Sequence, residues 1–205
     1  MSWKGFSDIQ GTIIIDTTKT EEELLQKVDR SRRKNIKQAL KENLEFVVGL
    51  EGDLEKWYII YCKVWMEKGL IPENIDTFKQ LNYKLYLIKK GQEILGGGVF
   101  IEFENKIVFK AYASLIEFQG LRVNDFLYWN SILYAKSKRK SVDLGGWQIK
   151  ARGNLKGVNK FKEMWGGKIV IYKIYSKNPF YIIGRKLIRN SNFCWELNKK
   201  LRGRK

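Results

Sequence analysis

The sequence predicts one α/β domain in which helices flank a mixed, mostly antiparallel sheet. Segments with helical and with strand periodicity alternate along most of the chain. Three strands also follow one another through short turns in its middle. The length of 205 residues suits a single domain with a sizeable core. We expect the domain to span residues 1–179 and a basic amphipathic helical tail to span residues 180–205.

The first third of the chain is predicted to form a strand, a helix and a second strand. Residues 12–17 are mostly β-branched, which favours a strand. Thr20 and Glu23 form a capping box, and the glutamates of this first turn suit the helix dipole. Apolar residues recur at helical spacing as far as Leu40, so we expect one helix there, followed by a strand over residues 44–50.

An aromatic-rich helix is predicted next, from Leu54 to the glycine at position 69. Its tryptophans and tyrosines recur at helical spacing. Such a stripe is usually part of a core, so we assign it to packing and not to base stacking. A shorter helix is expected over residues 75–81.

Three consecutive strands form the predicted centre of the sheet, over residues 83–89, 93–103 and 106–113. The separators between them have the composition of hairpin turns. Gly96-Gly97-Gly98 lies inside the middle strand, where glycine usually marks a bulge or a close approach of another group to the backbone. Gly97 is therefore a candidate for contact with a ligand.

The charge of the chain points to a polyanionic partner. Lys and Arg number 39 against 22 Asp and Glu, which gives a net charge of +17. This excess favours a nucleic acid, an anionic membrane or a phosphate-bearing substrate, although a solubilising surface is the alternative. Arg33, Lys34 and Lys37 fall within about one helical turn. They form either a solvated helix face or a phosphate contact.

Two residue types limit the chemistry. The chain has no histidine, which excludes a His-based triad, a His-ligated metal and imidazole as general base, and we expect no metal site. Cys62 and Cys194 lie in apolar contexts and are expected to be core thiols. Two cysteines without a secretory leader favour a reducing cytoplasm, and no apolar run reaches the length of a membrane span.

The most informative stretch is a strand and a helix that are each followed by paired glycines. Residues 142–147 (VDLGGW) predict a buried strand that ends in an acidic residue and two glycines. A cationic loop, in which Arg152 is a candidate substrate contact, leads to a helix that presents Phe161 and Lys162 and stops at Gly166-Gly167. Paired glycines let the backbone take positive φ and approach a ligand closely.

The order Asp-x-Gly-Gly, then Phe-Lys-x-x-aromatic-Gly-Gly, resembles the closing motif of the FemABX peptidyltransferases. These are acyltransferases with the GNAT fold that attach amino acids to peptidoglycan precursors. The resemblance implies a single GNAT-like domain, similar to the second of the two that these proteins usually contain. It also implies that Lys162 contacts the carbonyl oxygen or the terminal phosphate of the donor, beside Phe161. Asp143 would accept an amine proton or order the loop after its strand, and we favour ordering.

Four more positions are candidate substrate contacts. Tyr112 ends the third strand, and Lys68 stands where related proteins carry Lys-Gly or Arg-x-Gly near the acceptor. Arg122 and Asn124 precede an amphipathic helix expected over residues 125–138, where backbone N–H groups can converge on an anion. GNAT enzymes that use coenzyme A carry a glycine-rich motif in this loop. Its absence here lowers the expectation of acyl-CoA.

The C-terminal segment is apolar and basic. Residues 168–175 predict a further strand, and Pro179 is expected to break the chain. A helix or a pair of helices should follow from Phe180 to Arg204. This tail could dock on the domain, lie on an anionic membrane or help to bind RNA.

Two classes of function are consistent with these features. The first is a FemABX-like N-acyltransferase that moves an aminoacyl group from aminoacyl-tRNA, or an acyl group from acyl-CoA, to an amine acceptor such as a cell-wall peptide precursor. The second is a non-catalytic GNAT-like module that binds RNA or an anionic membrane. In either case no tightly bound cofactor is expected. We expect the protein to be cytoplasmic, either free or peripheral to the inner face of the membrane.

Overall fold

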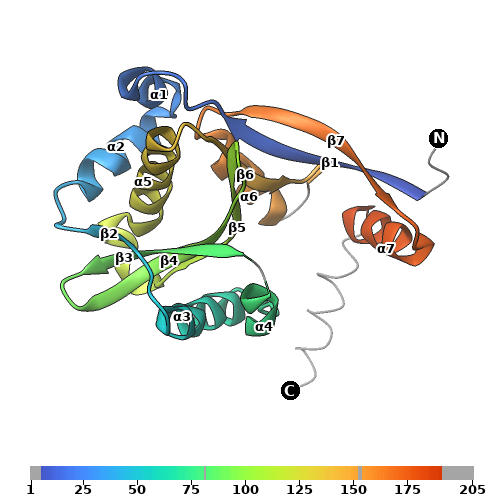
Figure 1. Ribbon diagram of the computed structural model, residues 1–205, viewed down its shortest axis with the longest axis horizontal. Coiled ribbons are helices and arrows are strands. Elements are labelled where there is room, and N and C mark those ends of the chain that lie inside the picture. Colours follow the sequence, from blue (N-terminus) through green and yellow to red (C-terminus); the bar gives the residue numbers. More distant parts are fainter. Residues whose placement is uncertain (1–5, 81, 152–153, 191–205) are drawn as a thin grey trace. The chain divides into compact units, whose positions relative to one another are not determined.

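The computed structural model describes residues 6–80, 82–151 and 154–190 (Figure 1). A seven-stranded sheet with the order β2-β3-β4-β5-β6-β1-β7 is flanked by helices. Strands β2 to β5 pair antiparallel in sequence order, whereas β5 and β6 pair parallel. The predicted α+β class with a mixed sheet is therefore confirmed.

The chain divides into two compact units. The larger unit comprises Ile14–Gly145 and Met164–Gly167. The smaller unit comprises the described parts of Met1–Ile13, Gly146–Glu163 and Lys168–Lys205. The elements of each unit are described separately below.

The larger unit begins with two helices where the sequence predicted one. The capping box is present, since the N–H of Glu23 donates to Thr20 Oγ1 and the N–H of Thr20 donates to Glu23 Oε2. However, α1 (Glu21–Lys27) ends at Val28, whose backbone is extended, and α2 (Arg30–Ala39) begins anew. Asp29 caps α2 by accepting from the N–H of Ser31, which explains the break. The strand β2 (Glu45–Val48) follows.

Helices α3 (Asp53–Glu67) and α4 (Ile75–Lys79) cover one face of the central hairpins, and α2 and α5 (Val123–Ser137) cover the other (Figure 1). The strands between these layers are β3 (Tyr83–Lys90), β4 (Glu93–Glu102) and β5 (Lys106–Ser114). On the α3 side, Trp57, Tyr61 and Phe78 are fully buried and their rings pack together. The assignment of the aromatic helix to the core is confirmed.

The glycine run of β4 is a place of close approach. A Cβ atom at Gly97 would lie 2.5 Å from the carbonyl oxygen of Tyr86 and 3.1 Å from Cδ1 of Trp57. The glycines themselves remain paired with β5, and the register shifts lie beside the run, after Val99 on one side and after Ile88 on the other. Glycine is needed at Gly97 because α3 packs directly on the backbone there.

A 3₁₀-helix and a strand complete the larger unit. The 3₁₀-helix η1 (Ile116–Leu121) occupies the segment between β5 and α5 that the sequence predicted as a loop. The strand β6 (Ser141–Trp147) follows α5, and its residues after Gly145 belong to the smaller unit. Gly145 and Gly166 have φ of +72° and +74°, as expected for the paired glycines.

The smaller unit contains β1 (Phe6–Ile15, up to Ile13), α6 (Asn154–Glu163), β7 (Lys168–Ser176) and α7 (Pro179–Asn190). The first strand is longer than predicted. Pro179 is the first residue of α7, a position that suits proline, so the predicted break between the strand and the C-terminal helix lies where expected. None of the described helices is long and apolar enough to span a bilayer.

Candidate functional site at the end of strand β5

A cavity of about 120 Å³ lies at the C-terminal end of β5. Four elements of the larger unit contribute to its wall, namely the last turn of α3, the end of β5, η1 and the first turn of α5. The residues that line it are Val64, Glu67, Lys68, Tyr112, Ala113, Ser114, Ile116, Gln119 and Asn124. The structure thus brings together three of the predicted contacts, Lys68, Tyr112 and Asn124, from three separate elements.

The parallel pairing of β5 with β6 stops short of this cavity. The register runs from Lys106 opposite Ser141 to Val108 opposite Asp143 and includes no later pair of described residues. On its other side, β5 pairs with β4 up to Ser114. The last residues of β5, which line the cavity, are therefore held in the sheet by their pairing with β4.

Tyr112 is half-buried in the cavity wall. Burial raises the pKa of Tyr112, and a hydrogen bond with the Tyr128 hydroxyl opposes this shift only partly. The two rings meet edge to face with centroids 5.1 Å apart, and Tyr128 stacks on Trp165 at 5.0 Å. The hydroxyl of Tyr112 therefore stays protonated at neutral pH and is a hydrogen-bonding group, held in position by a packed aromatic stack.

Asn124 lines the cavity at the start of α5. Its Oδ1 atom is buried and accepts no hydrogen bond from the described residues. Buried polar atoms are nearly always hydrogen-bonded, so an exception beside a cavity indicates a place for a ligand donor. Asn124 is the second residue of α5, which begins after Arg122 with φ of +59°.

Lys68 is exposed at the rim of the cavity, at the C-cap of α3. Cations are favourable at helix C-termini, so this position also suits a purely structural lysine. Glu67, beside it in sequence, brings an acidic group to the same wall. In the described part of the chain, no cluster of three acidic or cysteine side chains could hold a metal ion.

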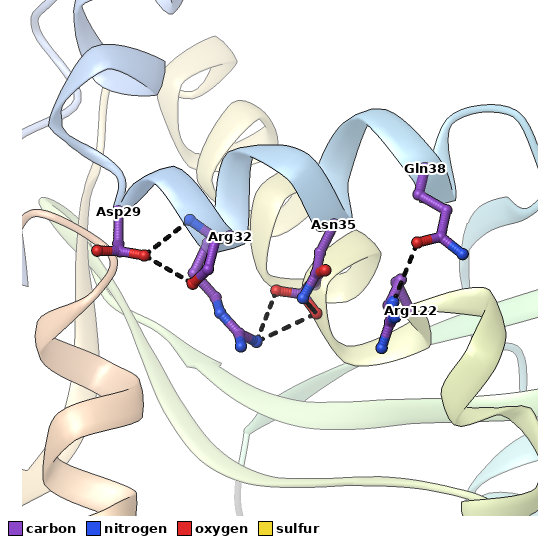
Figure 2. Close-up of polar contacts among 7 residues, drawn as sticks. Asp29, Arg32, Asn35, Gln38 and Arg122 are labelled. Atoms are coloured by element: carbon purple, nitrogen blue, oxygen red, sulfur yellow. Dashed lines mark hydrogen bonds and ion pairs between the residues drawn. The ribbon is translucent and has the colours of Figure 1, made fainter.

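Two predicted contacts do not line the cavity. Nε of Arg122 donates to Oε1 of Gln38 at 3.2 Å (Figure 2). Nε2 of Gln38 donates to the carbonyl of Gly120 at 3.0 Å. Arg122 thus fastens the start of α5 to α2. Gly97 pairs with Ala113 behind the cavity wall, where its lack of a side chain lets α3 approach.

The basic residues of α2 have different environments. Lys34 and Lys37 are exposed, whereas Nη1 of Arg33 donates to the carbonyl of Gln26 at 3.0 Å. Arg32, which the sequence did not single out, forms a partly buried ion pair with Asp125 at 3.0 Å (Figure 2). Arg32 and Arg33 therefore have structural contacts, and Arg32 is the one that links α2 to α5.

Asp125, in the first turn of α5, is a buried carboxyl group with a shifted pKa. Burial raises its pKa, while Arg32 and a hydrogen bond from Asn35 at 3.1 Å oppose the shift. One local feature of the sequence is consistent with this contact, namely an acidic residue in the first turn of an amphipathic helix. Its partner lies 93 residues earlier, which no local pattern can indicate.

The closing motif contains two sets of contacts. In the larger unit, the N–H of Gly145 donates to Oδ1 of Asp143 at 2.9 Å, and Lys106 Nζ lies 3.6 Å from Oδ2. This geometry holds the turn after the strand. In the smaller unit, Lys162 is only 7% exposed and its Nζ donates to the carbonyl of Gly146 at 2.9 Å. The ammonium group of Lys162 is therefore buried and not in open solvent.

Further contacts fix α6 within the smaller unit. The side chain of Asn159 bonds both the N–H and the carbonyl of Gln148, at 2.9 and 2.8 Å. Nε1 of Trp147 donates to Glu163 at 2.6 Å. Phe161 is half-buried on the same helix. Arg152 lies outside the described residues.

Comparison with known proteins supports the fold. No protein-family model matches the sequence, and no curated protein does. Among solved structures, FemX matches with a TM-score of 0.70 and 16% identity, over 84% of this chain and 63% of that one. The C-terminal domain of a putative lysylphosphatidylglycerol synthetase from Agrobacterium fabrum matches with a TM-score of 0.65 and 13% identity, over 89% of this chain and 65% of that one. L-PGS from Bacillus licheniformis matches with a TM-score of 0.62 and 16% identity, over 87% of this chain and 65% of that one.

The chain spans a little under two thirds of the length of each of these three structures. At identities of 13–16% such likeness concerns the fold alone. The chain has a GNAT-like fold and resembles the FemABX group in structure, as its closing motif led us to expect.

Proposed function

We propose that the protein is a FemABX-like acyltransferase that moves an aminoacyl group from aminoacyl-tRNA to an amine. The observation that carries this proposal is the cavity at the end of β5, which both Tyr112 and Asn124 line. The fold around it is shared with FemX, with L-PGS and with the C-terminal domain of a putative lysylphosphatidylglycerol synthetase. A cell-wall peptide precursor is the acceptor that the FemABX resemblance suggests.

The size of the cavity favours a small reacting group. Pockets that enclose whole drug-sized ligands measure about 300–1,000 Å³, and this one measures about 120 Å³. It therefore accommodates an aminoacyl or short acyl group, while the rest of the donor lies on the surface. A net charge of +17 suits a polyanionic donor of this kind.

The segment before α5 favours aminoacyl-tRNA over acyl-CoA. GNAT enzymes that use coenzyme A present a glycine-rich loop there, whereas this chain forms the 3₁₀-helix η1. Arg122, the cation of this segment, is engaged by Gln38 of α2. Acyl-CoA remains the second candidate donor, and the binding experiment below separates the two.

In the proposed reaction, the Tyr112 hydroxyl and the side-chain oxygen of Asn124 each form one hydrogen bond with a reacting group. The amine nitrogen attacks the ester carbonyl of the donor, a C–N bond forms, and the C–O bond to the tRNA breaks. The Tyr112 hydroxyl, kept protonated by its raised pKa, donates to the oxyanion that develops on the carbonyl. Oδ1 of Asn124 accepts from the attacking amine, which loses its proton to solvent as the ester oxygen gains one.

Lysine side chains are proposed to neutralise the donor. Lys68 would contact a phosphate at the rim of the cavity. Lys162 would meet negative charge from the donor, and its bond to the Gly146 carbonyl keeps the buried ammonium in a fixed position. Lys34 and Lys37, both exposed on α2, are proposed as further contacts with the tRNA backbone.

A binding and transfer assay tests the proposal. Thermal unfolding would be followed with charged tRNA, uncharged tRNA and coenzyme A, because a ligand that binds the folded state raises Tm. Transfer from a mixture of labelled aminoacyl-tRNAs to a peptide amine would be measured beside it. We expect protection by charged tRNA, and about a hundredfold slower transfer by Tyr112→Phe, since loss of one oxyanion donor costs this much.

Tyr58→Phe is the matched control. This substitution also removes one hydroxyl group from the larger unit, where Tyr58 donates to the carbonyl of Glu73. Tyr58 does not line the cavity. Transfer by this variant should equal that of the unchanged protein. Protection by coenzyme A alone would replace tRNA by acyl-CoA as the donor. Absence of transfer from either donor, with binding of RNA intact, would identify a non-catalytic module and refute the proposal.

A further inference from the structure

Strand β7 and helix α7 form a cationic segment without acidic residues. Between Lys168 and Asn190 the sequence contains no Asp or Glu, although the whole chain contains 22 of them. Six basic residues lie in this segment, namely Lys168, Lys173, Lys177, Arg185, Lys186 and Arg189. The positive charge of this part of the smaller unit is therefore not compensated within its own sequence.

The same segment exposes large apolar side chains. Those of β7 are 42–59% exposed at Ile169, Val170, Ile171, Tyr172 and Tyr175. Because successive side chains of a strand point to opposite faces, both faces of β7 are apolar and exposed. In α7, which contacts β7, Ile182 is buried while Phe180, Tyr181 and Ile183 are 79%, 50% and 49% exposed.

Such a surface is unusual for a protein that stays in water. Large contiguous apolar patches are rare on monomeric soluble proteins and usually mark a site of contact with another protein, a ligand or a membrane. The apolar side chains here are accompanied by exposed lysines, Lys168, Lys173 and Lys186. We call the exposed side chains of β7 and α7 the β7–α7 surface.

We propose that the β7–α7 surface binds peripherally to an anionic lipid bilayer. Apolar side chains of an interfacial segment enter the boundary between headgroups and acyl chains, while its cations attract the anionic headgroups. The segment combines both features and has no carboxylate to repel the lipid. This inference rests on the smaller unit and does not depend on the proposed transfer reaction.

Charge decides against a second copy of the chain as the occupant. β7 is an edge strand of the sheet, and an exposed edge can pair with another strand. Two copies would, however, bring two uncompensated basic segments together, which is unfavourable for strand pairing. RNA is also less suitable, because single strands are bound by stacking on aromatics, whereas half of the apolar side chains here are aliphatic.

Co-sedimentation of the full chain with vesicles tests this inference. We expect binding to vesicles of phosphatidylcholine mixed with phosphatidylglycerol, little binding to phosphatidylcholine alone, and weakening by salt. The triple variant Lys168→Gln, Lys173→Gln, Lys186→Gln should bind about a hundredfold more weakly, since each basic residue near an anionic surface contributes about fivefold. The double variant Phe180→Ser, Ile183→Ser should lose about tenfold or more.

Matched variants in the larger unit serve as controls. Lys41→Gln, Lys84→Gln, Lys138→Gln removes the same charge from exposed positions, and Ile59→Ser, Ile71→Ser removes exposed apolar side chains. Both should bind vesicles as the unchanged protein does. Equal losses in test and control variants would refute a specific surface, as would equal binding to neutral vesicles.

Two other outcomes would replace the lipid by another occupant. A dimer seen by analytical ultracentrifugation and lost in the β7–α7 variants would assign the surface to a second copy. Binding of RNA that is lost in these variants, without vesicle binding, would assign it to RNA. Transfer to a soluble amine is expected to be unchanged in the β7–α7 variants, so a failure here is distinguishable from a failure of the proposed reaction.

Discussion

Asn124 and Asp125 are neighbours in the first turn of α5 with opposite hydrogen-bonding environments. Asp125 accepts from Arg32 and Asn35, whereas Oδ1 of Asn124 is buried without a donor among the described residues. An unsatisfied buried polar group costs about 1–3 kcal/mol. Asn124 therefore lowers stability at the cavity, while Asp125 holds α2 against α5. Only the first of these two residues gains a partner if a ligand binds.

The first prediction separates stability from function at this position. Asn124→Ala should leave the free energy of unfolding unchanged or raise it by up to about 1 kcal/mol, because an unsatisfied acceptor is removed and alanine is the better helix former. Transfer should fall in the same variant. Urea denaturation measures the first effect. Asn35→Ala, which removes a donor to the buried carboxylate of Asp125, should instead lower the free energy of unfolding by about 1–2 kcal/mol. An equal loss in Asn124→Ala would contradict the interpretation that Oδ1 of Asn124 is an unsatisfied acceptor.

A pH dependence follows from the raised pKa of Asp125. A carboxyl with a higher pKa in the folded than in the unfolded state binds protons more tightly when folded. The cost of burying its charge is absent below the unfolded-state pKa of about 3.9 and grows as the pH rises to the raised folded-state value. The stability of Asp125→Asn should therefore rise relative to the unchanged protein as the pH increases through this window.

Urea titrations at a series of pH values check this slope. Asp29 supplies the control, because hydrogen bonds from Ser31 lower its pKa. Its stabilising contribution is present above the unfolded-state pKa and is lost as the pH falls, so Asp29→Asn should show the opposite slope. The same sign in both variants would show that the buried pair is governed by Arg32 and not by desolvation.

At the scale of elements, local signals in the sequence predicted the strands more accurately than the helix boundaries. The hairpins of β3, β4 and β5 were predicted within one residue at most ends, because strand periodicity and turn composition are both local. The break between α1 and α2 was missed, although Asp29 and Ser31 form a cap. The apolar positions continue through the break, and periodicity outweighed the capping signal.

The cavity could be predicted only in part. Lys68 was named from the resemblance to known proteins, whereas Tyr112 and Asn124 were named from their positions at a strand end and before a helix. The three residues lie on three elements. Gln119 and Glu67 line the same cavity, but nothing in their sequence neighbourhood distinguishes them from other surface residues. Long-range contacts such as Arg32 with Asp125 depend on how α2 packs on α5, which periodicity does not specify.

The capping box of α1 gives the prediction at this scale. Thr20→Val should lower the free energy of unfolding by about 1 kcal/mol, because the N–H of Glu23 loses its acceptor. Glu23→Gln is the matched control, since glutamine can still accept from the N–H of Thr20. It should cost much less in the same denaturation experiment. If both variants cost the same, the charge of the first turn and not the cap stabilises α1.

At the scale of the whole molecule, the net charge of +17 acts on folding as well as on binding. A large net charge keeps a protein soluble but destabilises its compact state by self-repulsion. The eight ion pairs seen among the described residues compensate only some of the cations. Repulsion between the remaining ones is long-ranged in dilute buffer, where no salt screens it.

The last prediction is that added salt stabilises the folded chain. Raising the ionic strength from about 0.01 M to about 0.15 M shortens the Debye length from about 30 Å to about 8 Å, so Tm should rise. Glu22→Gln, Glu51→Gln, Glu104→Gln, all at exposed positions, should steepen this dependence by removing three negative charges and so raising the net charge. Lys41→Gln, Lys84→Gln, Lys138→Gln should flatten it. A fall in Tm with salt, or equal slopes in the two triple variants, would mean that local ion pairs outweigh the net charge.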